Sequence, residues 1–226
     1  MLNVFHMDGR AVLLAACRST LAMLLGFAVL LDFGACAQAR QIRLVALGDS
    51  LTAGYQLGVR DAFPAVLEAA LRARGLDVVV ENAGVSGDTA TGGMERLDWS
   101  VPDGTDGVIV QLGANDALRG LSPVLTELVL DTILTRLKQR GIRVFLAGML
   151  APRNNGPQFT AAFDGMYPRL AAKHEVPLYP FFLEGVQGDP KLNLGDMMHP
   201  NPAGVQVIVA RILPMMESFV RAIAKP

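Results

Sequence analysis

Short apolar segments alternate with longer amphipathic segments along most of this chain, and this alternation restricts its fold more than any other feature. The apolar segments have the length of strands and are expected to be buried. The predicted strands are residues 42–47, 78–81, 108–112, 144–149 and 177–179. The longer segments have apolar residues at helical spacing. The predicted helices are residues 61–74, 122–140, 159–174 and 202–224.

Strands separated by helices favour a parallel sheet, because each connecting helix crosses over the sheet and covers one of its faces. The right-handed crossover rule then favours an open, doubly wound arrangement. The expected fold class is α/β, with three flavodoxin-like layers: a five-stranded parallel sheet in the order 2-1-3-4-5 and helices on both faces. Ligands of such sheets bind beyond the carboxyl ends of the strands, so the loops there are the expected place of a functional site.

Residues 1–37 have the pattern of a signal peptide. The apolar run at 21–31 has 11 residues, which is too short to span a bilayer but suits the hydrophobic part of a signal peptide. The small-x-small sequence Ala-Cys-Ala at 35–37 follows it, and cleavage is expected after this motif. The protein is therefore predicted to be periplasmic or secreted, with residues 38–226 as one domain. An uncleaved anchor and a lipoprotein modified at Cys36 are the alternatives.

The composition argues against some partners and sites. The net charge is −1 and no basic run occurs, which gives no electrostatic case for nucleic acid. Both cysteines, Cys17 and Cys36, lie in the predicted leader, so residues 38–226 can hold neither a disulfide nor a cysteine-based zinc site. Only two histidines remain in that segment, and no metal is expected. The oligomeric state is left open.

Four polar loops carry the residues that suit catalysis. Three of them follow predicted strands: Gly-Asp-Ser-Leu at 48–51, the segment 82–88 with Gly87, and Gly-Ala-Asn-Asp at 113–116. The fourth, Asp-Met-Met-His-Pro-Asn at 196–201, precedes the last predicted helix. The expected topology brings these loops to one edge of the sheet, where a rigid scaffold positions them.

The side chains in these loops suit nucleophilic catalysis by serine. A serine hydroxyl is a poor nucleophile until a nearby base takes its proton. Asp196 precedes His199 by three residues and can accept a hydrogen bond from one imidazole nitrogen, which leaves the other nitrogen to face Ser50. Ser50, Asp196 and His199 are therefore the predicted catalytic residues. The other histidine, His174, is expected to be a surface or helix-terminal residue.

Acyl transfer also needs hydrogen-bond donors for the charge that develops on the carbonyl oxygen of the substrate. The predicted oxyanion hole combines the backbone N–H groups of Ser50 and Gly87 with the side-chain amide of Asn115. Asp49 and Asp116 are expected to hold their loops through hydrogen bonds to nearby backbone, without a part in the chemistry.

These four blocks, in this order, resemble the GDSL or SGNH hydrolase family. The resemblance is closest to a branch of small bacterial periplasmic enzymes described as multifunctional thioesterases, arylesterases and lysophospholipases. It implies a serine esterase that hydrolyses aryl, acyl-lipid or lysophospholipid esters, with acyl thioesters as a further class, through an acyl-enzyme intermediate and without a metal or cofactor. Ala114 departs from that branch, which often has a second glycine there. A methyl group is tolerated if the backbone at Ala114 is not left-handed.

Two apolar loops, residues 117–122 and 181–198, are expected to form a groove for the acyl chain. The predicted substrate-binding residues are Leu118, Leu121, Phe181, Phe182, Met197 and Met198. The expected partner is a small-molecule ester or thioester, and transient contact with membrane lipids stays open.

Two other functions compete with this interpretation. A carbohydrate O-deacetylase would use the same triad, but Trp99 is the single tryptophan and the chain has three tyrosines, which offers little material for stacking on sugars. A non-catalytic, flavodoxin-like binding protein for a nucleotide or flavin is of a different class, and no G-x-G-x-x-G or P-loop pattern follows a strand to support it.

Overall fold

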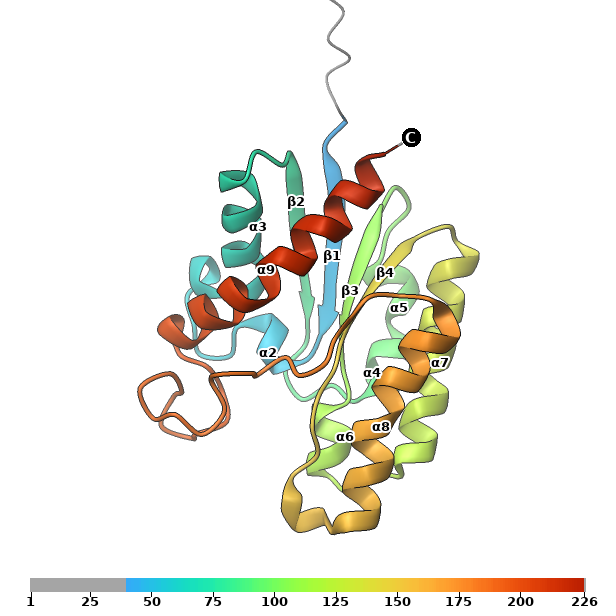
Figure 1. The fold of residues 1–226 in the computed structure, drawn as a ribbon, viewed down its shortest axis with the longest axis vertical. Helices are drawn as coiled ribbons and strands as arrows, with labels where there is room; N and C mark the ends of the chain where they lie inside the picture. Colours follow the sequence, from blue (N-terminus) through green and yellow to red (C-terminus); the bar gives the residue numbers. More distant parts are fainter. Residues whose placement is uncertain (1–39, 226) are drawn as a thin grey trace, which may run out of the picture. The chain divides into compact units, whose positions relative to one another are not determined.

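The computed structural model of this protein describes residues 40–225, and the predicted signal peptide lies outside the described residues. Five parallel strands form a single sheet at the centre of this part of the chain (Figure 1). They are β1 (Ile42–Gly48), β2 (Val78–Gly84), β3 (Gly107–Gln111), β4 (Arg143–Ala147) and β5 (Leu178–Tyr179). Their order, β2-β1-β3-β4-β5, confirms the order expected from the sequence.

Helices cover both faces of the sheet, which makes three layers (Figure 1). The helices are α2 (Ser50–Ala53), α3 (Phe63–Ala73), α4 (Ala90–Glu95), α5 (Leu97–Ser100), α6 (Ala114–Leu118), α7 (Pro123–Gln139), α8 (Pro157–His174) and α9 (Pro202–Ala224). On one face, α3 packs against β2 and α9, and α9 contacts β1. On the other face, α7 packs against β4 and contacts both α4 and α8.

The four longer helices agree with the predicted ones to within two residues at each end. The short helices α2, α4, α5 and α6 have no counterpart among the predicted elements. Each has only four to six residues, which is too few to display the apolar period of a helix.

The register of the sheet sets the level at which three loops begin. Gly48, the last residue of β1, pairs with Gly84 of β2 on one side and with Gln111 of β3 on the other. A Cβ atom at Gly48 would collide with the side chain of Thr52 and with the carbonyl oxygen of Gln111. Glycine is therefore required at this position, and the loops after three adjacent strands leave the sheet side by side.

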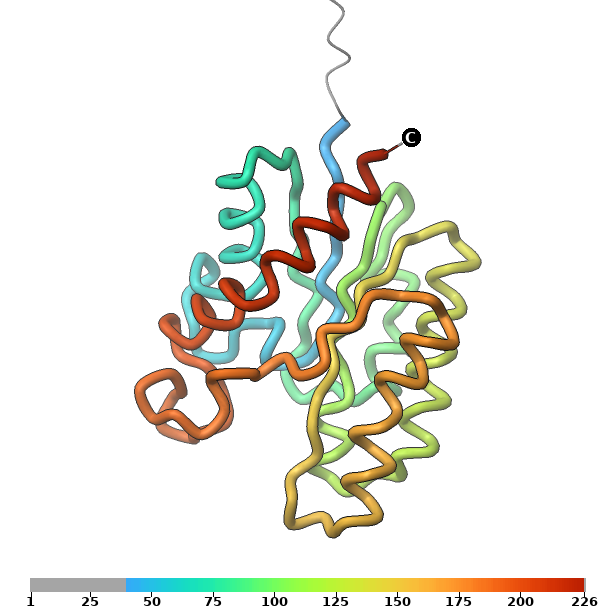
Figure 2. Tube along the Cα trace, viewed as in Figure 1, coloured from blue at the N-terminus to red at the C-terminus, as the bar shows by residue number. Residues whose placement is uncertain are grey.

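A long segment, residues 180–201, joins the edge strand β5 to α9. It passes beyond the carboxyl ends of the strands and folds into a loop before α9 begins (Figure 2). This path explains how a block that follows no neighbouring strand can reach the same edge of the sheet as the other three.

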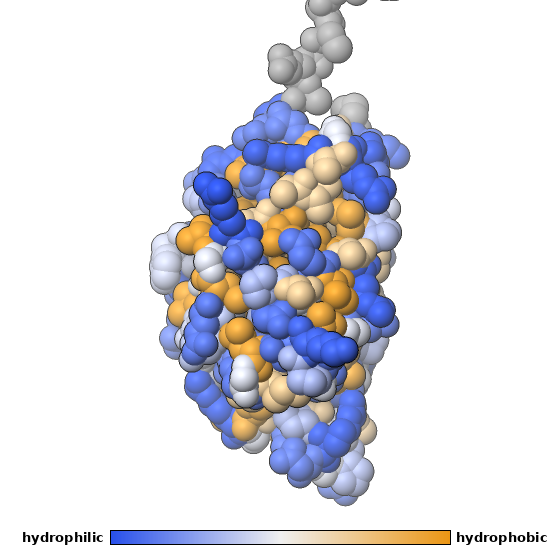
Figure 3. Space-filling view, turned by 90° about the vertical axis from the view of Figure 1, so that its left-hand side faces the viewer, coloured by the Kyte–Doolittle hydropathy of each residue, from blue (hydrophilic) through white to orange (hydrophobic). Residues whose placement is uncertain are grey.

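The surface of the molecule mixes residue types. On the side that lies left in Figure 1, hydrophilic and hydrophobic residues are interspersed (Figure 3). Within the part of the chain that the structure describes, no helix combines the length and apolar character needed to cross a membrane.

Candidate active site

Ser50 is the first residue of α2, directly beyond the carboxyl end of β1. Asp49 caps this helix, because its Oδ1 accepts a hydrogen bond from the backbone N–H of Leu51 at 3.0 Å. The helix ends after four residues at Gly54, whose φ of 80° lies in the left-handed region that favours glycine. Ser50 is thus held in a tight turn between a strand and a helix, with its side chain partly exposed.

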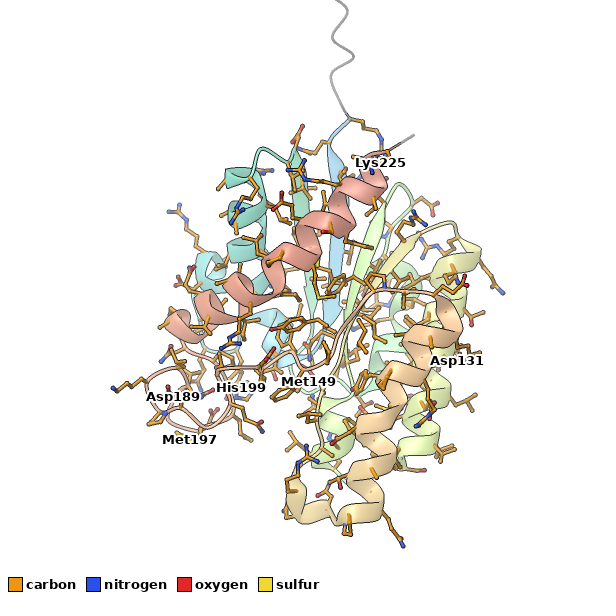
Figure 4. All side chains as sticks on the ribbon, in the orientation of Figure 1. Asp131, Met149, Asp189, Met197, His199 and Lys225 are labelled. Atoms are coloured by element: carbon orange, nitrogen blue, oxygen red, sulfur yellow. The ribbon has the colours of Figure 1, made fainter. Side chains whose placement is uncertain are left out.

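The structure brings Ser50, His199 and Asp196 together. His199 Nε2 lies 2.9 Å from Ser50 Oγ, and His199 Nδ1 lies 2.6 Å from Asp196 Oδ2. Figure 4 shows His199 on the segment that precedes α9, beyond the strand ends. The three side chains therefore form one continuous line of hydrogen-bond contacts.

The charge on Asp196 decides where the imidazole proton resides. Its Oδ1 accepts hydrogen bonds from the backbone N–H groups of His199 and Met198, at 3.0 and 2.9 Å. These bonds, together with the contact to the His199 ring, lower the pKa of Asp196 to about 2. Because an ionised carboxylate only accepts hydrogen bonds, His199 Nδ1 carries the shared proton. In the neutral imidazole, Nε2 is then free to accept the proton of Ser50.

Tyr55 is a neighbour of the site that carries no sequence signal. Its ring lies against the His199 ring, with centroids 4.5 Å apart and planes tilted by 39°. This contact restricts the imidazole on one side. Tyr55 lies in the irregular segment after α2, where the number of residues from Ser50 does not predict which way a side chain points.

The predicted oxyanion donors lie just beyond three adjacent strands: Ser50 begins α2 after β1, Gly87 lies in the loop after β2, and Asn115 lies in the first turn of α6 after β3. Gly87 has a φ of 87°, a conformation that side chains rarely adopt. The Asn115 side-chain amide donates one hydrogen bond to the carbonyl of Asp88 at 2.9 Å, which leaves its second N–H for another acceptor. Arg119 donates to the carbonyl of Gly87 at 2.7 Å. The loop that contains Gly87 is therefore held from two sides.

Asp116 accepts one hydrogen bond from backbone and one from a side chain, and the backbone donor is distant in the chain, whereas nearby backbone was expected. Its Oδ2 accepts from the backbone N–H of Ala90 at 2.9 Å, and its Oδ1 accepts from the Thr126 hydroxyl at 3.2 Å. Ala114 begins α6 and its φ is not positive, so the backbone there is not left-handed and its methyl group is accommodated.

A cavity of about 330 Å³ opens beside Ser50, and Asn115 and His199 also line it. Most of the remaining lining is apolar. The apolar lining residues are Leu51, Ala114, Leu118, Met149, Leu150, Pro152, Leu183, Met197 and Met198. Residues 149–152 follow β4, and Figure 4 shows Met149 near His199 beyond the strands. Their place after a strand is the sequence signal that would have found them.

Three of the predicted substrate-binding residues do not line this cavity. The ring of Phe182 is fully buried against Phe63, with ring centroids 4.9 Å apart, and Phe181 packs against the core. Leu121 is exposed outside the lining. The predicted contact of Phe182 with an acyl chain is wrong, because core packing occupies the whole side chain.

His174 ends α8, as predicted, but it is buried rather than on the surface. Its Nε2 lies 2.6 Å from Asp131 Oδ1. It also lines a cavity of about 960 Å³ at the amino-terminal end of β4, the edge of the sheet opposite Ser50. Among residues 40–225, no cluster of three or more His, Cys, Asp and Glu side chains could hold a metal ion.

An open parallel α/β sheet with serine, histidine and aspartate in contact beyond its carboxyl edge, and with the Asn115 amide lining the same cavity as the serine, is the arrangement of a serine hydrolase. The model of the GDSL-like lipase/acylhydrolase family matches residues 46–207, which covers most of the described chain. The chain belongs to this family, and it is a serine esterase.

Named relatives agree with this assignment. The chain is 38% identical over 180 residues to an arylesterase of Vibrio mimicus, a match that covers 79% of this chain and 90% of the relative. It is 39% identical over 176 residues to the thioesterase 1/protease 1/lysophospholipase L1 of Escherichia coli strain K12, covering 77% and 82% of the two chains. The chain also matches the crystal structure of AlinE4, an SGNH-hydrolase family esterase, with a TM-score of 0.68 and 42% sequence identity. This match covers 80% of this chain and 97% of AlinE4.

Asp49 gives the folded protein a pH dependence that can be measured. The carboxyl is fully buried, and among the described residues its Oδ2 has no hydrogen-bond partner. Burial raises the pKa of Asp49 from 3.8 to about 6. The stability that the protonated form contributes is therefore fully present below pH 3.8 and is lost as the pH rises through about 6.

We predict that the free energy of unfolding of the wild type, relative to Asp49→Asn, falls by roughly 3 kcal/mol as the pH rises from about 3 to 7. Asparagine keeps an acceptor for the cap of α2 but does not titrate. Urea unfolding of both proteins across this range measures the difference. Parallel curves for the two proteins would show that Asp49 does not titrate as burial requires.

Proposed function

We propose that Ser50 is the nucleophile of this esterase, that His199 is its general base and acid, and that Asp196 orients His199. We further propose that its substrates are aryl, acyl-lipid or lysophospholipid esters, together with acyl thioesters. The observation that carries the catalytic roles is the line of contacts of 2.9 and 2.6 Å from Ser50 through His199 to Asp196. Relatives named arylesterase and thioesterase/lysophospholipase support the substrate range.

The mechanism follows from these contacts. His199 Nε2 takes the proton of Ser50 while Oγ attacks the carbonyl carbon, and the ionised Asp196 stabilises the imidazolium that forms. The backbone N–H groups of Ser50 and Gly87 and the free amide N–H of Asn115 donate to the oxyanion. The imidazolium then protonates the leaving oxygen or sulfur as its bond to the carbonyl carbon breaks, so that an alcohol or thiol departs and an acyl group stays on Ser50. Water, activated by His199, releases the carboxylic acid and restores the serine.

The apolar cavity beside Ser50 is the proposed site for the acyl chain. It is lined by Leu118 of α6, by Met197 and Met198 of the segment before α9, and by Leu183 and Met149. Leu118, Met197 and Met198 are also substantially exposed, so they form its outer rim. An apolar chain that enters gains free energy in proportion to the surface that it buries.

The carbohydrate O-deacetylase is the second candidate. Trp99 lies on α5, is 73% exposed and is not among the cavity-lining residues, so it offers no stacking surface for a sugar at this site. Comparing hydrolysis of acetylated xylan with that of octanoyl esters distinguishes the candidates, and we expect the octanoyl esters to be preferred.

We also propose that the protein is exported to the periplasm or the medium, and that its signal peptide is removed by cleavage after Ala37. The apolar run followed by the small-x-small motif supports this. Mass spectrometry of protein secreted by a bacterial host should show an N-terminus at Gln38. Intact Met1 protein retained in the membrane would contradict cleavage, and a lipid on Cys36 would identify a lipoprotein instead.

The catalytic roles predict a specific mutational pattern. Ser50→Ala and His199→Ala should each remove nearly all hydrolysis of a p-nitrophenyl ester, and the double variant should be little worse, because triad members act as a unit. Asn115→Ala should lower kcat by about 10²–10³ with a similar KM, through loss of one oxyanion donor. Ser122→Ala is the matched control, because Ser122 is exposed and its side chain does not cap α7. Wild-type rates from folded Ser50→Ala would disprove the mechanism.

The acyl site predicts a dependence on chain length. Each methylene that enters the cavity contributes about 0.8 kcal/mol, so kcat/KM should rise about fourfold per carbon from acetate esters and then level off when the cavity is full. Leu118→Ser should flatten this rise and leave acetate esters unaffected. Leu121→Ser should leave the profile unchanged, because Leu121 is exposed but does not line the cavity. A flat wild-type profile up to octanoate would rule out this acyl site.

A further inference from the structure

Arg96 is a buried cation at the same edge of the sheet as Ser50. It lies between the short helices α4 and α5, and it is only 6% exposed. A buried charge is costly unless partners compensate it, so a buried guanidinium normally has a structural or functional reason.

Every nitrogen of the guanidinium donates a hydrogen bond. Nη2 donates to the carbonyl of Gly48 at 2.8 Å, and Nε donates to Asp88 Oδ2 at 2.6 Å. Nη1 donates to the carbonyl of Ala83 at 2.8 Å and to Ser100 Oγ at 3.0 Å. One planar group therefore joins the ends of β1 and β2 to the loop that contains Asp88.

These acceptors stand next to the proposed oxyanion donors. Gly48 precedes Ser50 by two residues, and Asp88 directly follows Gly87. The carbonyl of Asp88 also accepts the hydrogen bond from the Asn115 amide, so Asp88 links the guanidinium to the third donor. All three donors are thus connected to Arg96 through short covalent or hydrogen-bonded paths.

We propose that Arg96 is a positioning residue that holds the three oxyanion donors in the arrangement that the transition state requires. The inference rests on the proposed roles of Ser50, Gly87 and Asn115. Arginine suits this task because its rigid fork donates in several fixed directions at once, whereas lysine offers a compact point charge on a flexible stem. Arg96 does not touch the substrate cavity, so it acts on the transition state through the loops and not on ground-state binding.

The test replaces Arg96 by lysine, which keeps the charge and removes the fork. Arg96→Lys should lower kcat by about tenfold to a hundredfold, with KM changed less than about twofold, because small misplacement of catalytic groups costs rate. The affinity for a trifluoromethyl ketone, whose hydrated or serine-bound form resembles the oxyanion, should fall by the same factor as kcat. Rates are expressed per active site, counted by labelling with a fluorophosphonate, so that any unfolded fraction is excluded.

Arg140→Lys is the matched control. Like Arg96, Arg140 holds a loop by a hydrogen bond to backbone, because it donates to the carbonyl of Val101 at 2.6 Å. Neither Val101 nor Asp103, the other partner of this side chain, lies in the segments that contain the three oxyanion donors. Its kcat per labelled site should equal that of the wild type. Asp88→Asn should reduce kcat in the same direction as Arg96→Lys, and the double variant should be less than additive, because both changes break one network.

Two results would overturn the proposal. One is an unchanged kcat per labelled site in Arg96→Lys. The other is a loss of kcat and of inhibitor affinity in Arg140→Lys that is as large as the loss in Arg96→Lys. Failure of the proposed function is distinguishable, since it would appear in the wild type as labelling at a residue other than Ser50.

Discussion

The hydrogen-bonded register of β1 with its two neighbours is the constraint on which the rest of the site depends. That register sets Gly48 level with Gly84 and Gln111, the last residues of β2 and β3. Parallel strands are joined by crossover helices, so loops at one edge come from segments far apart in the chain. The serine-bearing turn therefore begins beside the loop that contains Gly87 and the start of α6, which contains Asn115. Close packing around Gly48 leaves no space for a side chain that would push these loops apart.

His199 does not directly follow a strand of the sheet, so hydrogen bonds outside the sheet hold it in position. The backbone N–H of Leu194 donates to the carbonyl of His199 at 2.7 Å, which closes the loop around the aspartate and histidine. The Asn201 amide donates to the carbonyl of Lys191 at 2.8 Å, and its Oδ1 accepts from Gly204 N–H at 3.0 Å to cap α9. One side chain thus ties the loop to the start of the last helix. A residue without strand register acquires a fixed position in this way.

Two buried charged residues at this edge are compensated to different degrees. Arg96 has hydrogen-bond partners on all three nitrogens, with the carboxylate of Asp88 among them. Asp49 is also buried, and only one of its oxygens has a hydrogen-bond partner among the described residues, so desolvation raises its pKa to about 6. The compensated cation can hold loops at little cost in stability at neutral pH. The carboxylate caps the helix that begins with Ser50, and its charge opposes folding there.

The strands and the segments that carry Ser50, Asp196 and His199 could be predicted from the sequence, because hydrophobic period and side-chain chemistry are local properties. The strand order could also be predicted, because the crossover rule leaves few arrangements for alternating strands and helices. Which apolar side chains face the cavity could not be predicted, because it depends on the packing of the folded chain. Phe182 and Leu183 are adjacent in the chain, yet Phe182 is buried against the core and Leu183 lines the cavity. An irregular loop has no period that orients its side chains, so packing against distant segments sets their direction. The role of Arg96 is hidden for the same reason, since three separate segments of the chain supply its acceptors.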